Sequence, residues 1–199
     1  ATSPDGVVWT KRPGPDEGGS VLGLAAPDGE RLSVGSPSVV REGTLFRMWH
    51  EAYDGATWRL AHATSLDGIA WTETGVVLEP GPPGSLDEAG VRHPVVLASP
   101  SGYELWYQGR SRSSPAFHVL RARSADGRNW RKLEGEIGLH ADPPARADEE
   151  VRVGSVLARP GGAREVFFSK ETTTARAAAF GVVSSRTTSI YAEVVAPGQ

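Results

Sequence analysis

Short apolar segments recur along the chain in a fixed order, and each is about as long as one β-strand. Their alternating or continuous apolar patterns, over only a few residues, are typical of strands rather than of amphipathic helices. Each of three modules contains three such segments, then a turn, and then a fourth strand-length segment. The first two segments of the modules are SPSVV, HPVVL and VGSVL at 36–40, 93–97 and 153–157, and FRMWHE, YELWYQ and EVFFSK at 46–51, 103–108 and 165–170.

A heptad with the pattern S-x-D-G-x-x-W recurs in phase with these segments. It occurs as SPDGVVW at 3–9, as SLDGIAW at 65–71 and as SADGRNW at 124–130, and an eroded fourth copy covers 184–190. Successive copies begin 62, 59 and 60 residues apart. A period of this length suits one blade or module of a repeat protein rather than one pair of helices.

The residues of the heptad have a local structural explanation. Ser and Asp side chains accept hydrogen bonds from nearby backbone N–H groups, glycine supplies the positive φ that such a turn needs, and Trp is large enough to wedge between sheets. We therefore predict turns at Asp67, Asp126 and, in the eroded copy, Arg186, with Trp71 and Trp130 packed between sheets. Identity repeated in every module indicates a scaffold, so the heptads are not candidates for a functional site.

Four short antiparallel strands per module predict an all-β fold, a β-propeller of four-stranded antiparallel blades. The modules cover approximately residues 10–71, 72–130 and 131–190 of a single propeller domain or propeller fragment. Residues 1–3 repeat the Ala-Thr-Ser of residues 63–65, where a third strand ends, so we expect about three blades plus one strand. A missing N-terminal segment or another chain would then complete the ring, because closure removes exposed sheet edges.

Composition indicates a soluble globular protein and excludes several classes of function. The chain has 39% hydrophobic and 23% charged residues and a net charge of −3, which argues against a nucleic-acid partner. No apolar run is long enough to span a membrane, so no membrane partner is expected. The absence of cysteine excludes disulfides, a thiolate nucleophile and Cys-ligated zinc.

Motifs for bound cofactors are also missing from the sequence. There is no phosphate-binding loop and no dinucleotide fingerprint, and the histidines lack metal-ligand spacing, so we expect no cofactor and no metal. Residues 10–34 are rich in Gly and Pro and indicate a long loop between blades, with room for one short strand. No signal peptide is visible, which leaves both a cytoplasmic location and secretion after processing open.

The modules resemble a known family. The run P-S-V-V, then a strand with Met-Trp-His, then A-T-S-x-D-G-x-x-W is similar to the five-bladed propeller glycosidases and their relatives, which include arabinanases, β-xylosidases, invertases, levansucrases and β-mannoside phosphorylases. The resemblance covers essentially the whole chain. It implies a five-bladed propeller whose central funnel holds a sugar-binding pocket, with catalytic carboxylates from different blades and often an Asp just before the Pro of the P-S-V motif.

This sequence departs from the family pattern at that aspartate. The aligned positions hold Ser36, His93 and Val153. Glycoside hydrolysis usually needs two carboxyl groups, one protonated and one ionised, and neither Ser nor Val can take these roles. Because the first strand of each blade begins near the funnel in the family, the resemblance implies that Ser36 and His93 face the ligand.

Other carboxylates lie just ahead of these positions. If their loops line the funnel mouth, Glu150 or Asp87 supplies a catalytic acid. Arg152 or Arg92 then holds it ionised or binds a carboxylate or phosphate of the ligand. The alternative is that Asp87 and residues 148–150 belong to solvated acidic loops.

The second segments end in different residues at one repeated position, Glu51, Gln108 and Lys170. Such variation indicates a surface that the scaffold does not dictate, for example a binding funnel, and makes Glu51 a candidate acid/base group and Gln108 a candidate ligand-binding residue. His50 is a further candidate, but neighbouring strand residues point to opposite faces, so only one of His50 and Glu51 can face the ligand. The alternative for His50 is burial beside Trp49.

Three functions remain open. The first is a glycosidase that acts on a carbohydrate with acid/base carboxylates. The second is a non-catalytic relative whose funnel binds a sugar or another small polar ligand, and the third is a relative recruited for a different reaction with His93 and the arginines. Fold alone does not choose among them, because one fold can carry many functions.

Overall fold

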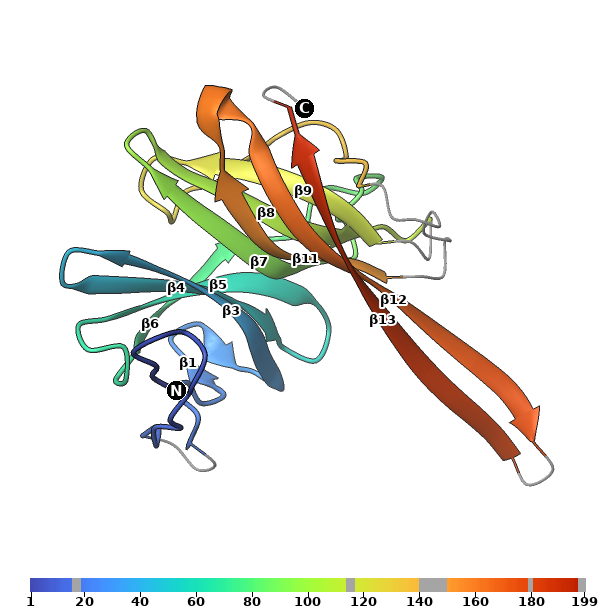
Figure 1. Ribbon diagram of the computed structural model, residues 1–199, viewed down its shortest axis with the longest axis horizontal. Coiled ribbons are helices and arrows are strands. Elements are labelled where there is room, and N and C mark those ends of the chain that lie inside the picture. Colours follow the sequence, from blue (N-terminus) through green and yellow to red (C-terminus); the bar gives the residue numbers. More distant parts are fainter. Residues whose placement is uncertain (16–18, 114–116, 140–149, 179–180, 197–199) are drawn as a thin grey trace.

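The protein is all-β, as the sequence predicts. A computed structural model describes residues 1–15, 19–113, 117–139, 150–178 and 181–196. Within these residues the chain forms three antiparallel sheets and one two-stranded hairpin, and it contains no α-helix (Figure 1). Accordingly, none of the described residues forms a helix of the length and apolar character needed to cross a membrane.

Two sheets have four strands each, which confirms the predicted blade composition. The first sheet has the order β3-β4-β5-β6, with β3 at Ser33–Glu42, β4 at Leu45–Tyr53, β5 at Trp58–Ser65 and β6 at Thr72–Leu78. The second has the order β10-β9-β8-β7, with β7 at Gly90–Ser99, β8 at Gly102–Arg110, β9 at Phe117–Ser124 and β10 at Arg131–Lys132. Before the first sheet, β1 (Ala25–Ala26) and β2 (Gly29–Glu30) form a short hairpin within the Gly- and Pro-rich stretch.

The third sheet differs from the other two. It consists of β11 (Glu150–Ala158), β12 (Arg164–Ala178) and β13 (Gly181–Val195), with a short 3-10 turn at Pro160–Gly162 before β12. The predicted turn at Arg186 is wrong, because the eroded heptad lies inside β13 and pairs with β12. Arg186 and Thr187 stand where the intact copies have Asp and Gly, so the turn-forming groups are absent, and the β-branched threonine favours a strand.

The intact heptads form the predicted turns. Ser65 Oγ donates to Asp67 Oδ1 at 2.9 Å and accepts from the N–H of Gly68 at 2.8 Å. Asp67 Oδ1 also accepts from the backbone N–H groups two and three residues on, at 2.8 and 2.9 Å. The same hydrogen bonds recur in the copies that begin at Ser3 and Ser124, and the glycine has a positive φ of 73° to 76° in all three copies.

Aromatic residues join the first two sheets near the heptad turns. Trp49 is fully buried, and its Nε1 donates to the carbonyl oxygen of Gly127 in the second sheet's turn at 2.7 Å. Trp130 packs edge-on against Trp49, with ring centroids 6.2 Å apart, so it lies between sheets as predicted. Trp71 is only half-buried, and its Nε1 donates to Gly68 in its own turn. A second apolar cluster joins the second and third sheets and includes Trp106, Val119, Val153, Val156, Val166 and Phe168.

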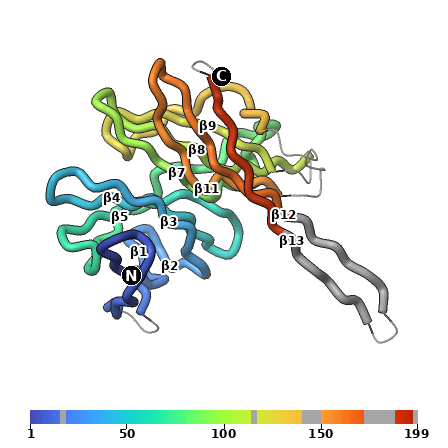
Figure 2. The backbone as a smooth tube through the Cα atoms, viewed as in Figure 1, coloured from blue at the N-terminus to red at the C-terminus, as the bar shows by residue number. Residues whose placement is uncertain are grey.

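The first strands of the three sheets lie together. β7 packs against β3 on one side and against β11 on the other (Figure 1). Figure 2 shows that the backbone passes from one sheet to the next in sequence order. Each first strand has an irregular register with its partner, at residues 35–38, 92–95 and 153–155. These irregularities re-aim side chains, and the candidate site is built around them.

Candidate functional site

Ser36 and His93 occupy equivalent bulges on β3 and β7 and are brought together. Both have positive φ angles, 48° for Ser36 and 49° for His93. Ser36 Oγ and His93 Nδ1 lie 2.8 Å apart, within hydrogen-bond distance across the two sheets. Positive φ is unfavourable for residues other than glycine, and such strain tends to persist where it serves a function. The sequence identified this pair because both residues precede the Pro of the repeated motif.

Glu51, at the end of β4, pairs with Arg92 on β7. Its two carboxylate oxygens lie 3.1 and 3.2 Å from Nη2 and Nε of Arg92, and one of them accepts the backbone N–H of His93 at 3.3 Å. Burial alone would raise the pKa of Glu51. The hydrogen bonds from Arg92 and the positive charges of His93 and Arg92 outweigh burial and hold the pKa below its usual value of 4.5.

Glu150 and Arg152 form the matching pair at the start of β11. Arg152 Nη2 donates to Glu150 Oε2 at 2.7 Å, and Nη1 lies 3.5 Å from Glu171 on β12. Burial would raise the pKa of Glu150, but the hydrogen bond and charge of Arg152 lower it overall, and the charges of His93 and Arg92 add to this. Glu150 therefore remains ionised at neutral pH, and Arg152, one of the two arginines that the sequence offered as its partner, is the one that binds it.

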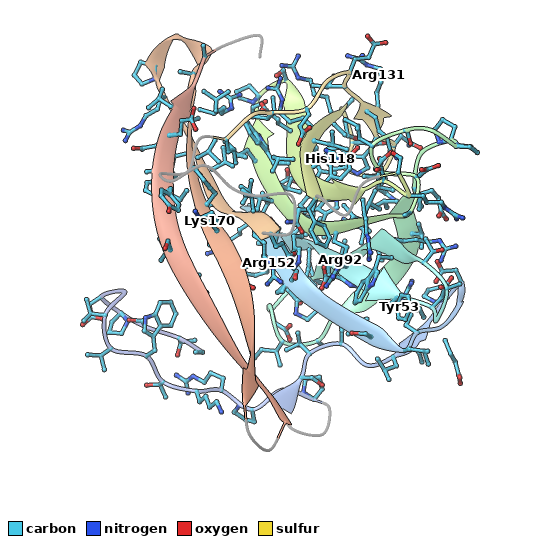
Figure 3. The ribbon with its side chains drawn as sticks, turned by 90° about the vertical axis from the view of Figure 1, so that its right-hand side faces the viewer. Tyr53, Arg92, His118, Arg131, Arg152 and Lys170 are labelled. Atoms are coloured by element: carbon cyan, nitrogen blue, oxygen red, sulfur yellow. The ribbon has the colours of Figure 1, made fainter. Side chains whose placement is uncertain are left out.

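His93 lies between the two ion pairs. Its Nδ1 is 3.6 Å from Glu51 Oε2, and its Nε2 is 3.6 Å from Glu150 Oε1. Burial lowers the pKa of the imidazole, the two glutamates oppose this, and Arg152 and Arg92 reinforce it, so the net shift is downward. We call these five residues, Glu51, Arg92, His93, Glu150 and Arg152, the funnel cluster. Figure 3 shows Arg92 and Arg152 in the same part of the molecule.

Three buried polar atoms of the funnel cluster lack hydrogen-bond partners, namely His93 Nε2, Glu150 Oε1 and Arg152 Nε. The first two face each other across 3.6 Å. An unpaired buried polar group costs about 1–3 kcal/mol, so a hydroxyl group that reached both atoms would recover that energy. The arginines are the more exposed members, with 26% and 30% of the Arg92 and Arg152 side chains accessible. The cluster therefore presents cations outward and keeps its carboxylates mostly covered.

A stack of side chains at the same end of the first sheet holds Arg92. The Arg92 guanidinium lies over the Trp58 ring, 4.0 Å from its centroid, and Tyr53 stacks on Trp58 at 4.9 Å with an interplanar angle of 24°. Both faces of Trp58 are thus in contact, which fixes the guanidinium against Glu51. The sequence analysis missed Trp58 and Glu171, because neither occupies a repeated position next to the motif.

Asp87 lies outside the funnel cluster. Its carboxylate accepts from Lys132 Nζ at 2.5 Å, from Tyr107 Oη at 3.0 Å and from Ser85 Oγ at 2.9 Å, and the residue is 3% exposed. Arg92, which could have held Asp87 ionised, binds Glu51 instead. The geometry therefore gives Asp87 contacts that tie its loop to the second sheet rather than a position at the funnel.

His50 and Gln108 also have mainly structural contacts. His50 is 2% exposed, and its Nε2 lies 3.8 Å from Glu73, on the face of β4 opposite to Glu51. It lines an apolar groove of about 280 Å³ together with Val34 and Met48. Gln108 Nε2 donates to the carbonyl oxygen of Val151, so this residue links the second and third sheets.

Other aromatic and polar residues of the repeats are buried or fall outside the described part of the chain. Trp49, Trp106 and Tyr107, the aromatic residues of the second segments, are at most 2% exposed and pack in the core. His140, Asp148 and Glu149 lie outside the described residues. Among the residues that the structure does describe, no group of three or more His, Asp and Glu could hold a metal ion.

The chain has relatives of known sequence. No protein-family model matches it. It is 29% identical over 147 residues to two uncharacterized proteins of Mycobacterium tuberculosis, MT1551 and Rv1502, with 69% of this chain and 47% of each relative covered. The chain thus spans about half the length of the curated relatives it matches.

Several solved structures of other proteins resemble the fold of this chain. A structure described with the GH130 family of mannoside phosphorylases, which contains glycoside hydrolases that target β-1,2 mannosidic linkages in Candida mannan, matches with a TM-score of 0.56 and 18% identity, over 76% of this chain and 48% of that one. A glycosyl hydrolase from Bacteroides ovatus matches with a TM-score of 0.54 and 19% identity, over 69% of this chain and 45% of that one. A family 117 glycoside hydrolase of the marine bacterium Zobellia galactanivorans matches with a TM-score of 0.55 and 16% identity, over 86% of this chain and 56% of that one. These likenesses show the fold, a β-propeller of antiparallel blades, which is the fold that the repeats predict.

Proposed function

We propose that this protein binds carbohydrate at the funnel cluster. The supporting observation is that two arginines and two carboxylates from different sheets surround His93, where the first strands meet. Carboxylates accept hydrogen bonds from sugar hydroxyls, and guanidinium groups donate to sugar oxygens. The unpaired atoms of His93 and Glu150 offer one further hydroxyl position.

The protonation states of the cluster favour binding over hydrolysis. A glycosidase needs one carboxyl group that stays protonated, usually because its environment raises its pKa. The pKa of Glu51 and that of Glu150 are both lowered, and each glutamate already pairs with an arginine. Burial lowers the pKa of His93 as well. The cluster thus offers acceptors and fixed cations, but no proton donor in the form of a carboxylic acid.

Calorimetric titration with a panel of neutral mono- and disaccharides tests this proposal. We expect one or more sugars to bind the parent, and His93→Ala to weaken that binding at least about tenfold, because the ring lies between both ion pairs. Glu134→Gln removes an exposed carboxylate outside the cluster and serves as the matched control. If no sugar binds the parent, or if His93→Ala and Glu134→Gln bind alike, the proposal fails.

Hydrolysis of a glycosidic bond is the second candidate. Glu51 and Glu150 come from different sheets and flank His93, and this arrangement of two carboxylates is what such chemistry uses. A ligand that displaced Arg152 would raise the pKa of Glu150 and let it act as the acid. With a panel of 4-nitrophenyl glycosides, Glu150→Gln should then cut turnover at least ~10²-fold. Sugar binding without turnover of any of these substrates would favour the binding function.

We further propose that additional blades cover the outer faces of this chain, as a preceding segment or another chain. The described residues form three blade-like sheets, fewer than the ~4 to 8 blades of a closed propeller. Ile190, Val194 and Leu157 on the third sheet are 79%, 63% and 47% exposed. Exposed apolar residues on an open sheet favour association. Sedimentation of the 199-residue chain should therefore show association, and a monodisperse monomer at high concentration would contradict this.

A further inference from the structure

A second candidate site lies at the opposite end of the second sheet from the funnel cluster. It is a groove of about 550 Å³ where β8, β9 and β10 approach the start of β12. Its lining is polar and includes Ser101, Glu104, Arg123, Asn129, Arg131 and Arg164. Figure 3 shows Arg131 well away from Arg92 and Arg152.

Three charged residues form a row across the second sheet at this groove. Glu104 on β8 pairs in register with Arg123 on β9, which in turn pairs in register with Arg131 on β10. Directly opposed residues of antiparallel strands project on the same face, and like charges in such positions repel each other. Arg123 and Arg131 therefore make an unfavourable pair unless a negative charge lies between them.

Glu104 does not provide that charge. Its oxygens accept from Trp106 Nε1 at 2.9 Å and from Arg164 Nη2 at 2.8 Å, and one of them lies 3.7 Å from Arg121 Nη1. Glu104 is thus held by groups other than Arg123, although the two residues are neighbours in register.

The surroundings are electropositive as a whole. Burial lowers the pKa of Arg121, Glu104 opposes this, and the charges of Arg123 and Arg164 lower it further. Asp126, in the adjacent turn, is engaged by Ser124, Asn129 and the backbone. The groove itself is lined by three arginines, Arg123, Arg131 and Arg164, and by one carboxylate, Glu104.

We infer that this groove binds a small molecule through a phosphate group. Guanidinium groups present planar, paired donors that match phosphate oxygens, and a doubly charged group between Arg123 and Arg131 would convert their repulsion into attraction. The groove has space for a phosphate with an organic substituent, and Asn129 and Ser101 line it as polar neighbours. The inference is independent of the proposed carbohydrate binding, because it uses none of the same residues.

Titration with sodium pyrophosphate and with sodium sulfate at constant ionic strength tests the inference. We expect pyrophosphate to bind the parent, sulfate to bind more weakly, and Arg123→Gln and Arg131→Gln each to weaken pyrophosphate binding at least about tenfold. Arg128→Gln removes an exposed arginine from the same turn region without lining the groove, and should change affinity less than about threefold.

A melting measurement without any added phosphate gives a second readout. Because it relieves the repulsion, Arg131→Gln should raise the melting temperature, while Arg128→Gln should not. Failure of the parent to bind pyrophosphate, equal losses in Arg128→Gln and Arg131→Gln, or equal affinity for sulfate would each overturn the assignment of a phosphate site.

Discussion

In the first and second sheets, the end with the heptad turns and the end with the funnel cluster differ in how well equivalent residues match between the sheets. At the heptad end, Asp67 and Asp126 are identical in type and make identical hydrogen bonds to their own backbones. At the funnel end, equivalent positions hold different residues. Ser36 of the first sheet is equivalent to His93 of the second, and Glu51 is equivalent to Gln108. The repeated residues build each turn locally, whereas the variable residues make contacts between sheets.

The two ends also differ in how their charges are stabilised. The heptad aspartates are exposed and are bound by N–H groups two and three residues away. The funnel carboxylates are largely buried and are bound by arginines, in the case of Glu51 by an arginine of another sheet. Buried ion pairs depend on correct packing of the whole molecule, whereas local hydrogen bonds do not. Identity among repeats therefore marks the scaffold, and departure from it marks the candidate site.

The largest expected effect concerns the scaffold between the first two sheets. Trp49→Ala should lower the free energy of unfolding by about 3–5 kcal/mol, because it empties a fully buried site that contacts Gly127 and Trp130. Trp9→Ala is the matched control, since Trp9 belongs to a heptad but is 61% exposed. Denaturant unfolding of both variants measures the difference, and equal losses would mean that Trp49 does not join the sheets.

A buried histidine of the scaffold should dominate the pH dependence of stability near pH 5. Burial, with smaller effects from Arg47, Arg128 and His50, lowers the pKa of His62 from 6.5 to about 4. A lowered folded pKa means that its stability contribution is present above pH 6.5 and is lost as the pH falls towards 4. The loss is roughly 3 kcal/mol, at about 1.36 kcal/mol per unit of pKa.

The control for this prediction is the histidine at the funnel end. His62→Gln should flatten the fall in unfolding free energy between pH 6.5 and 4, measured by denaturant titration at several pH values. His93→Gln should flatten it less, because Glu51 and Glu150 oppose the lowering of the His93 pKa. A larger effect from His93→Gln would reverse the comparison between the two ends.

The funnel end should show a smaller effect that depends on acid conditions. Arg92→Gln leaves Glu51 buried without its ion-pair partner and should lower the free energy of unfolding by about 1–3 kcal/mol at pH 7. Because the folded pKa of Glu51 is lowered, this contribution is present above pH 4.5 and disappears as the pH falls through the lower folded value. Parent and variant should therefore converge in strong acid.

Arg59→Gln is the matched control for Arg92→Gln. Both arginine side chains are 26% exposed, but the partners of Arg59 are 36% and 62% exposed, whereas Glu51 is 7% exposed. Exposed ion pairs contribute little, so Arg59→Gln should change stability by less than about 1 kcal/mol. If both variants lose the same stability at pH 7, burial of Glu51 is not what distinguishes the funnel end.

The smallest effect is expected at the heptad turns. Backbone hydrogen bonds from Ile69 and Ala70 lower the pKa of Asp67, so the turn favours the ionised form. Asp67→Asn should lower the melting temperature slightly at pH 7, and Asp5→Asn should do the same by a similar amount, because both copies make the same local bonds. If Asp67→Asn lowered the melting temperature as much as Arg92→Gln does, the turns would stabilise more of the protein than their own local structure.

Most of the fold follows from the sequence because its determinants are local. Alternating apolar segments specify strands, and Ser, Asp and Gly at fixed offsets specify the turns that join them. The same logic explains why the turn predicted at Arg186 is wrong, because this vestige of the heptad lacks the Asp and the Gly. Without those two residues, nothing local stops the strand.

The candidate site was predictable only in part. The repeat placed Ser36 and His93 at equivalent positions, and the structure brings the two side chains together. For Glu150 and Asp87 the sequence left open whether Arg152 or Arg92 is the partner, and the structure pairs Arg152 with Glu150. The sequence could not show that Arg92 binds Glu51 rather than Asp87, which is nearer to it along the chain. It also could not show that Arg92 lies over the ring of Trp58.

The sequence by itself determined the strands, the turns and the order of the sheets, because these depend on hydrogen bonds and apolar patterns within a few residues. Tertiary structure decided which charges meet. Glu51 and Arg92 are 41 residues apart and come together only because β3 and β7 pack side by side. Ion pairing depends on distances between elements and on burial, and no spacing along the chain encodes either of them.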